Sequence, residues 1–352
     1  MKKLLSKLTK LNGFSVTAIG WLFDPKDFAS SNNFLIGTDD GCAYETSWPQ
    51  DDRLLSSREL PFLKMACDLS SFLVDSNKFL TTVDDSHHIA KEAAICSIKC
   101  FRLKEIDSYC ILIATTKFFF QYLGTANYAK DGPFLYNIIQ NPTQRSHKEM
   151  SGYIFPTKLD LYYAKDRNYP KRFGWLTRKL AISFWLLAIY FETGAGVYHC
   201  PVPSDLNPNE DQPFLEDSSF IRYVSSESSI NTSSASEQTP LSFVISSFHL
   251  LLLYSTKLTI VCVLNQEIIH EEQFTSGRAL DIVKDPLLNT IWILTKRDIF
   301  HCKLCREDRN IWEIYLKKKD FESARIYAQN DLVKLDRTIC EEAVHCFSRK
   351  EY

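Results

Sequence analysis

The chain has 352 residues, of which 45% are hydrophobic and 24% charged, so it can bury a large core and is not a disordered polypeptide. The 41 Lys and Arg residues against 43 Asp and Glu residues give a net charge of −2, which leaves no global excess to draw the protein onto nucleic acid or anionic lipid. Only 11 Gly and 13 Pro exclude a collagen-like class, and the aromatic share of 13% favours packed β-structure.

The N-terminal segment, residues 1–10, is basic and carries a few leucines, but it lacks the apolar stretch of a secretory signal peptide. The 11 cysteines are scattered, odd in number and mostly embedded in apolar runs, which predicts buried free thiols instead of a disulfide framework. A reducing compartment fits this pattern best, so a cytoplasmic location is expected.

Several short segments repeat one pattern, in which an apolar run is followed by Thr or Ser with turn-forming or basic residues and then by a second apolar run. The clear copies span residues 34–44, 111–120, 251–260 and 291–300. The first contains Asp40-Gly41, a strong hairpin signal. A fifth hairpin is expected from residues 173–177, with residues 194–198 as its return strand.

The spacing of these hairpins indicates an architecture. Thr38 and Thr115 are 77 positions apart, about two units, and Ser255 and Thr295 are 40 apart. A four-stranded propeller blade takes about 40 to 45 residues. We therefore expect a mainly β fold, with about five β-propeller blades over residues 12–305.

Two segments interrupt this pattern. Leu180 to Phe191 is an apolar run broken only by Ser183, and as a helix it would span roughly 18 Å, short of the ~30 Å of a bilayer core. A buried strand or core segment is the favoured interpretation, with an interfacial helix as the alternative. Residues 201–240 are rich in Ser and acidic residues and cannot bury enough apolar area to order themselves, which predicts a flexible loop.

After about residue 306 the apolar period changes from two to roughly 3.6, which predicts helices over residues 306–352 at the start of an α-solenoid. Asp320 is placed as an N-cap between two of them. One apolar stripe continues through Leu332, Leu335, Ile339, Ala343 and Phe347. The first helices are expected to dock onto the last blade through Trp312, Tyr315, Leu316 and Phe321; the alternative is that these residues form a core among the helices alone.

The sequence offers few groups for chemistry. Cys302 and Cys305 form a C-x-x-C pair beside His301, but no second pair at knuckle spacing completes a zinc site. A structural role is favoured, with a metal- or thiol-dependent enzyme as the alternative. No nucleophile elbow, phosphate loop or H-E-x-x-H signature is present, so we expect no catalytic residues, no metal and no cofactor. The basic runs at residues 317–319 and 167–172 are interpreted as solvated faces, with a protein partner or lipid headgroups as alternatives.

The junction between repeat and helices carries a family resemblance. Residues 279–285 lead to Thr290-Ile291-Trp292-Ile293-Leu294-Thr295, then to Asn310-Ile311-Trp312-Glu313 and Asp320-Phe321-Glu322-Ser323-Ala324. This stretch closely resembles the deep orange family, that is the vacuolar protein sorting-associated protein 18 family. Residues 16–21, 35–38, 113–116 and 248–253 are similar to the same family, so the resemblance runs from about residue 12 to the C-terminus.

The resemblance implies a seven-bladed propeller, a long α-solenoid and a RING zinc domain, in a core subunit of the HOPS and CORVET tethering complexes. It also implies partners, namely other class C vacuolar sorting subunits, SNAREs and Rab GTPases, with peripheral association on late endosomes and lysosomes or vacuoles. On this basis we expect a non-catalytic scaffold in vesicle docking and fusion, with neither nucleic acid nor a small molecule as ligand. The alternative is a propeller–solenoid scaffold of another assembly, such as a vesicle coat or nuclear pore.

The chain departs from the family pattern in three respects. About five blade hairpins are seen instead of seven, and the helices stop early without a RING, so neither zinc binding nor a ubiquitin-ligase role carries over. Residues 178–193 intervene where the family has a tight hairpin, for which we hypothesise a splicing or gene-model artefact. An open arc of five blades would leave two sheet faces bare, so we expect an incomplete scaffold with poor solubility or dependence on partners.

Overall fold

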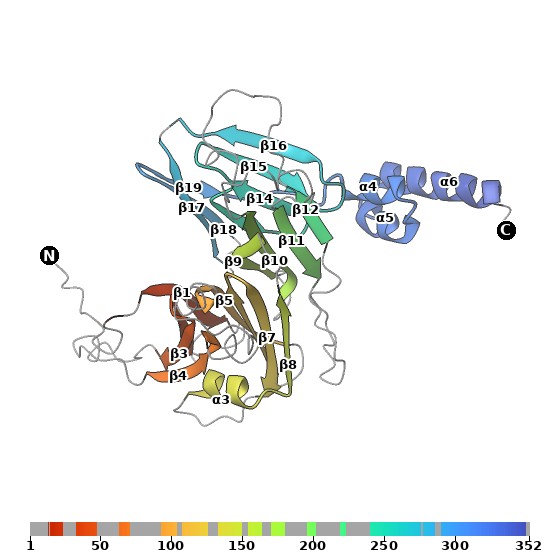
Figure 1. Ribbon diagram of the computed structural model, residues 1–352. Helices are drawn as coiled ribbons and strands as arrows, with labels where there is room; N and C mark the ends of the chain where they lie inside the picture. The colour runs from red at the N-terminus through yellow and green to blue at the C-terminus, as the bar shows by residue number, and fades with distance from the viewer. Residues whose placement is uncertain are drawn as a thin grey trace, which may run out of the picture. The chain divides into compact units, whose positions relative to one another are not determined.

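The computed structural model describes part of the chain, in two compact units, residues 1–230 and 231–352 (Figure 1). The described residues are 13, 15–23, 33–47, 63–70, 93–103, 108–125, 133–149, 154–163, 170–179, 196–201, 219–222, 240–275, 277–285 and 290–349. Three expectations fall wholly or mostly outside them: the basic N-terminus, the apolar run 180–191 and the loop 201–240. Of the loop, the structure describes residues 201, 219–222 and 240.

The mainly β prediction is confirmed, and the strands form five antiparallel meanders that we call blades A to E. Blade A comprises β1 (Val16–Phe23), β2 (Asn33–Thr38), β3 (Cys42–Ser47) and β4 (Lys64–Asp68). Blade B comprises β5 (Ile95–Arg102), β6 (Ser108–Thr115), β7 (Phe118–Thr125) and β8 (Gln144–Glu149). Blade C comprises β9 (Ile154–Tyr163), β10 (Pro170–Lys179), β11 (Gly196–Pro201) and β12 (Ser219–Arg222).

Blades D and E belong to the second unit. Blade D comprises β13 (Ser242–Ile245), β14 (His249–Leu253), β15 (Lys257–Cys262) and β16 (Ile268–Gln273). Blade E comprises β17 (Ala279–Asp285), β18 (Thr290–Thr295) and β19 (Ile299–Cys302). Each of the five hairpins expected from the sequence is the pair formed by the second and third strands of one blade.

In blades B and E the repeated Thr of the sequence pattern closes the hairpin. Thr115 Oγ1 donates to the carbonyl of Phe118 and accepts from its N–H, at 3.2 and 2.9 Å. Thr295 makes the same pair of bonds with Asp298, at 3.0 and 2.9 Å. A hydroxyl in this position bonds the turn backbone locally, as in other Ser/Thr turns. The Thr-Lys signal in the sequence therefore reflects the chemistry of a turn.

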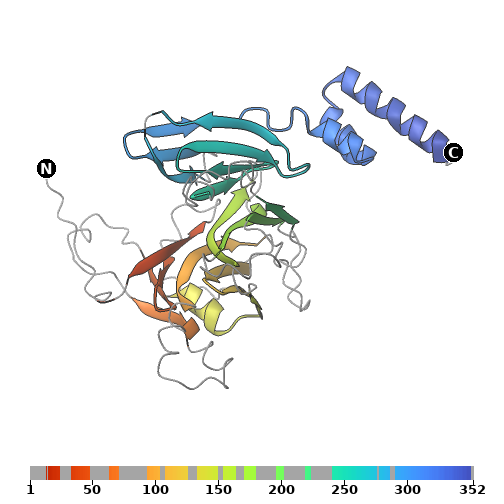
Figure 2. The same cartoon turned by 45° about the horizontal axis from the view of Figure 1, so that its top comes forward.

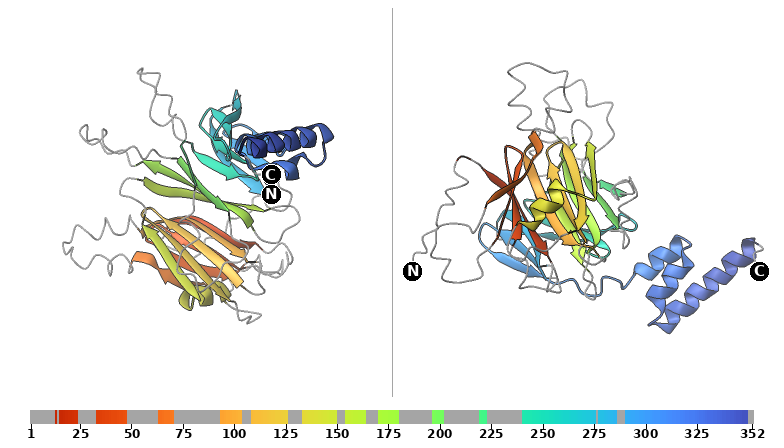
Figure 3. Two further views of the ribbon diagram at one scale, coloured as in Figure 1. Left: turned by 90° about the vertical axis from the view of Figure 1, so that its right-hand side faces the viewer. Right: turned by 90° about the horizontal axis from the view of Figure 1, so that it is seen from below.

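Blades A and B meet at their first strands, where β1 and β5 run parallel, with Leu22 opposite Cys100 (Figure 3). The two blades bury a joint core that includes Leu35, Ile98 and Ile111. Gly20 permits this approach, because a Cβ there would lie 2.4 Å from Ile98 Cγ2.

A short helix in blade B was not predicted from the sequence. Helix α3 (Phe134–Gln140) buries Leu135, Ile138 and Ile139 in the core of blades A and B. Its N-cap residue, Pro133, makes no side-chain cap. The fully buried Glu45 of β3 replaces it: the N–H groups of Leu135 and Tyr136 donate to its carboxylate at 3.0 and 2.6 Å.

Blade D packs face to face on blade E in the second unit (Figure 2). The shared core is apolar and draws on both sheets: Val244, Leu251, Leu253 and Leu258 from blade D, and Ala279, Ile282, Ile291 and Ile293 from blade E. Blade E thereby has one face covered by blade D.

Three helices follow blade E: α4 (Ile311–Lys317), α5 (Phe321–Ala328) and α6 (Leu332–Arg349). The expected N-cap is present, since Ser323 N–H donates to Asp320 Oδ1 at 3.1 Å. Most of the apolar stripe of α6 is exposed, however: Leu332 is 77% and Phe347 74% exposed, while Leu335 packs against the core of the helices. No helix within the described residues is long and apolar enough to span a membrane.

Candidate functional site

The junction between blade D and the helices is the candidate site, because the sequence places its candidate functional residues there. Trp312 and Leu316 are buried with Ala324 and Ala328, and Tyr315 and Phe321 pack against them. These contacts form a core among α4, α5 and α6. The role of Trp312, Tyr315, Leu316 and Phe321 in docking the helices onto the last blade stays a prediction.

A second apolar cluster joins helices and sheet directly. Phe248 and Cys262 of blade D bury Ile311, the first residue of α4, and Tyr315 and Tyr327 pack against them. The Tyr327 ring stands edge-on to Phe248, with ring centroids 5.3 Å apart, and stacks on Tyr315 at 5.6 Å. Of the residues chosen from the sequence, Tyr315 alone belongs to both clusters.

The sequence reasoning missed Ile311, Ile314 and Tyr327 as contacts with the sheet. The available signal was periodic: Ile311 lies three and four residues before Ile314 and Tyr315, which puts all three on one helical face. The partner of that face on blade D, Phe248, belongs to a hairpin turn more than 60 residues earlier, and no local pattern connects the two.

A polar contact lies beside this cluster. Glu307, in the segment before α4, accepts a hydrogen bond from Ser246 Oγ, and its Oε1 lies 3.0 Å from Nδ1 of His249. Burial disfavours the charged carboxylate, but the hydrogen bonds from His249 and Ser246 and the attraction of His249 outweigh it. The pKa of Glu307 is therefore lowered from its ordinary value of 4.5.

The basic run at residues 317–319 separates into three different environments. Lys318 Nζ donates to the carbonyl of Leu264 at 2.5 Å and so ties α4 to blade D. Lys317 pairs with Glu313 one turn back in α4, with 3.8 Å between their charged atoms. Lys319 has a φ of 63° and ends the turn after α4. The run is thus not one uniform charged face.

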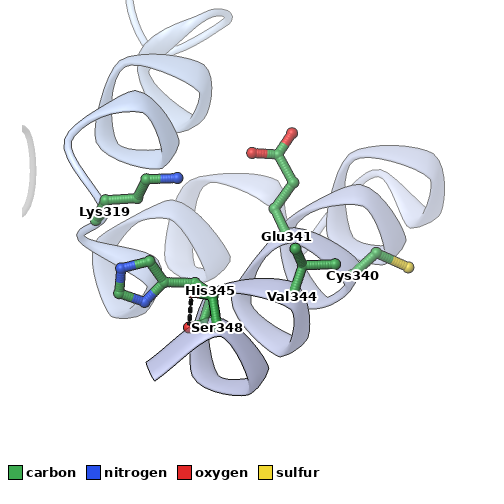
Figure 4. Close-up of a pocket in the computed structure, with 6 residues that line it drawn as sticks. All are labelled: Lys319, Cys340, Glu341, Val344, His345 and Ser348. Carbon is green, nitrogen blue, oxygen red and sulfur yellow. Dashed lines mark hydrogen bonds between the residues drawn. The ribbon is translucent and has the colours of Figure 1, made fainter. Parts of the chain in front are cut away.

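An open cavity of about 410 Å³ lies on α6, lined by Lys319, Cys340, Glu341, Val344, His345 and Ser348 (Figure 4). Figure 4 shows Lys319 and His345 at one end, with the Cys340 sulfur directed away from them. Ser348 Oγ donates to the backbone carbonyl of His345 at 2.7 Å and so stays within its own helix. The lining groups do not converge on a common point.

The C-x-x-C pair does not form a compact site in the described structure. Cys302 packs against the core of blades D and E, while Cys305 is exposed. Burial raises the pKa of the Cys302 thiol, which disfavours the reactive thiolate. The His301 ring stacks on Trp292 with centroids 4.6 Å apart. Among the residues that the structure describes, no three His, Cys, Asp or Glu side chains gather as metal ligands.

Comparison with known proteins identifies relatives of the chain. A family model described as the Pep3/Vps18/deep orange beta-propeller domain matches residues 1–304. The vacuolar protein sorting-associated protein 18 homolog of Danio rerio is 24% identical over 352 residues, covering 98% of this chain and 31% of the relative. The Drosophila melanogaster homolog is 35% identical over 117 residues, covering 32% and 12%. Vacuolar sorting protein 18 of Arabidopsis thaliana is 21% identical over 356 residues, covering 98% and 31%.

The chain therefore spans about a third of the length of the Danio rerio and Arabidopsis thaliana relatives. Among solved structures, the β-propeller domain of Myceliophteria thermophila Cps50 (Swd1) aligns with a TM-score of 0.41 and 12% identity, covering 83% of this chain and 66% of that one.

Proposed function

Because the chain belongs to the Pep3/Vps18/deep orange β-propeller family, we propose that it is a non-catalytic scaffold subunit of HOPS- or CORVET-type tethering complexes. The observation that carries the proposal is the family match over residues 1–304, which is followed at once by helices packed on blade D. A sheet repeat continued by stacked helices suits a protein that holds others in place.

The junction supports a scaffold role because it holds the helices to blade D through two kinds of contact. Ile311 is 2% exposed under Phe248, and Glu307 bonds Ser246 and His249 beside it. Apolar burial supplies the attachment, and the directional hydrogen bonds fix its orientation. We also propose that Tyr315, which packs against the core formed with Trp312, Leu316 and Phe321, sets the angle at which the helices leave the blade.

The partners in this proposal are other class C vacuolar sorting subunits, with SNAREs and Rab GTPases reached through the complex. The proposed location is the cytoplasmic face of late endosomes and lysosomes or vacuoles, as a peripheral protein. The names of the relatives, which refer to vacuolar sorting, support this location.

Affinity purification from cells tests the proposal. The tagged full chain is compared with Ile311→Asp, which places a charge in the junction, and with Glu322→Gln on the exposed side of α5 as a matched control. We expect vacuolar sorting subunits to copurify with the wild type and the control, and less with Ile311→Asp. Recovery of vesicle-coat or nuclear-pore subunits instead would contradict the proposal. Stoichiometric zinc in the purified protein would favour the metal-dependent alternative.

A further inference from the structure

Blade E differs from the other blades in its outer edge. Blades A, B, C and D each have four strands, whereas blade E has three in the described part of the chain. Its outer strand, β19, pairs with β18 on one side. On its other side, no strand pairs with β19 within the described residues, which leaves that side as a sheet edge there. Such edges readily pair with another extended chain.

The register identifies which backbone groups of β19 face this free edge. Thr295 N–H donates to Asp298 O at 2.9 Å, so these two residues form a hydrogen-bonded pair that closes the β18–β19 hairpin. Hydrogen-bonded and non-bonded pairs alternate along an antiparallel ladder. Phe300 and Cys302, opposite Ile293 and Ile291, therefore bond to β18. The N–H and C=O groups of Ile299 and His301 point outward.

The side chains around this edge are apolar on both faces of the sheet. Ile299 is 68% exposed and lies on the same face as Trp292, which is 40% exposed. The His301 ring stacks on Trp292 on this face. On the other face Phe300 lies against Phe274, with ring centroids 5.8 Å apart. An added strand with alternating apolar residues would find contacts for its side chains on either face.

One end of the edge is positively charged. Lys296 and Arg297 form the turn before β19, and Lys296 N–H donates to Arg278 O at 3.0 Å, which brings a third cation to the same place. All three are exposed, and none forms an ion pair within the described residues. Asp298 is the acidic residue in this turn, so the three cations outnumber it. Acidic groups on a partner would be attracted to this end.

We propose that β19 accepts a fourth strand from a partner protein, and that this strand carries alternating apolar residues and an acidic C-terminal end. The neighbouring strands of every blade are antiparallel, so an added strand would run antiparallel to β19 and place its C-terminal end beside Arg278, Lys296 and Arg297. The inference goes beyond the proposed scaffold role, since it does not depend on which complex the protein joins.

The test uses the full chain and a phage-displayed library of random twelve-residue peptides. Peptides selected on the wild type are compared for binding to Ile299→Pro, which removes one outward N–H and leaves the bonds to β18 intact. Ile299→Thr, which keeps the N–H, is the matched control. We expect selected peptides to alternate apolar residues and end in Asp or Glu, to lose at least about tenfold in affinity on Ile299→Pro, and to lose little on Ile299→Thr.

A second measurement keeps the test independent of whether Ile299→Pro folds. In hydrogen exchange on the wild type, the amides of Ile299 and His301 are expected to slow when a selected peptide binds, while those of Phe300 and Cys302 are slow already. Arg297→Glu is expected to weaken the selected peptides, with a smaller effect at high salt.

Three outcomes would overturn the proposal. One is a library that yields no peptide able to slow exchange at Ile299 and His301. Another is equal affinity of the selected peptides for wild type and for Arg297→Glu, which would show that this end of the edge does not attract acidic groups of a partner. The third is a dimer in light scattering that Ile299→Pro converts to a monomer, because the edge would then pair with a second copy of the chain.

Discussion

Both units attach helical structure to a sheet with the help of a carboxylate, and the two carboxylates respond to their surroundings in opposite ways. In the first unit Glu45 receives backbone N–H groups of α3 and Nδ2 of Asn33, and burial raises its pKa in spite of these bonds. In the second unit Glu307 faces His249 and Ser246, and its pKa is lowered.

The difference shows what a buried carboxylate needs from its partners. Neutral amides satisfy the hydrogen-bonding capacity of Glu45, but they supply no full positive charge to offset the loss of hydration. At Glu307 the attraction of His249 is added to the hydrogen bonds, and Glu307 is also less deeply buried, at 16% side-chain exposure. The α3 attachment is therefore expected to weaken on ionisation, and the junction to strengthen.

The largest effect is expected from Glu45→Ala. It removes the acceptor of the buried Leu135 N–H and of the part-buried Tyr136 N–H, together with the bond from Asn33 Nδ2. This is expected to cost about 3 kcal/mol of the free energy of unfolding of the first unit. Glu45→Gln retains one acceptor oxygen and is expected to cost less. Urea denaturation measures both, with Asn137→Ala on the exposed side of α3 as the control. A cost for Glu45→Ala no larger than the control's would show that the cap is dispensable.

Tyr327→Ala tests the corresponding attachment in the second unit. It removes the ring that contacts both Phe248 and Tyr315, so the helices are expected to loosen from blade D at a cost of about 2 kcal/mol. Faster proteolysis in the segment before α4 is the readout. Tyr327→Phe keeps the ring and should be cleaved more slowly than Tyr327→Ala. If the two variants are cleaved equally fast, ring packing is not what holds the junction.

The pH dependence is expected to have opposite signs at the two sites. The pKa of Glu307 lies below 4.5 in the folded protein, so its stabilisation is present above pH 4.5 and is lost as the pH falls through the folded value. The pKa of Glu45 lies above 4.5, so its contribution is present below pH 4.5 and is lost as the pH rises through the folded value.

Hydrogen exchange of α3 and α4, corrected for intrinsic rates, measures these effects. In α4, the amides of wild type should become increasingly better protected than those of Glu307→Gln as the pH rises. In α3, the amides of wild type should lose protection relative to those of Glu45→Gln over the same rise in pH. Parallel trends at the two helices would contradict the comparison.

The smallest effect is expected within the basic run of α4. The Lys317 side chain is 75% exposed and pairs with Glu313 within its own helix, so Lys317→Ala should change the unfolding free energy by about 0.3 kcal/mol. Lys318→Ala removes a bond to the Leu264 carbonyl and should loosen the junction more. Equal melting temperatures for the two variants would show that the bond to Leu264 contributes nothing.

The hairpins were predictable because their signals are local. Asp40-Gly41 and the Thr-Lys turns lie within a few residues of the strands that they connect, and Gly41 adopts the φ of 90° that such a turn requires. Helix α3 was not predictable in the same way. It has no side-chain cap of its own, and its acceptor, Glu45, lies 90 residues earlier than Leu135.

The candidate site was predictable in part for a similar reason. The 3.6-residue period identified the apolar faces of α4 and α5, including Trp312 and Leu316, but a period does not name the surface that a face packs against. Tyr327 and Phe248 could be paired only in three dimensions. The exposed stripe of α6 makes the same point, because its pattern predicts a helix and leaves open what covers it.

The hydroxyl-closed turns have a consequence for the order of folding. Closing the β6–β7 hairpin brings together Thr115 and Phe118, three residues apart, whereas joining β1 to β5 brings together Gly20 and Cys100, 80 residues apart. The entropy lost on loop closure grows with the length of chain enclosed. We therefore expect the hairpins to form early and the β1–β5 contact late, so that Gly20→Ala mainly speeds unfolding and Thr115→Val mainly slows folding.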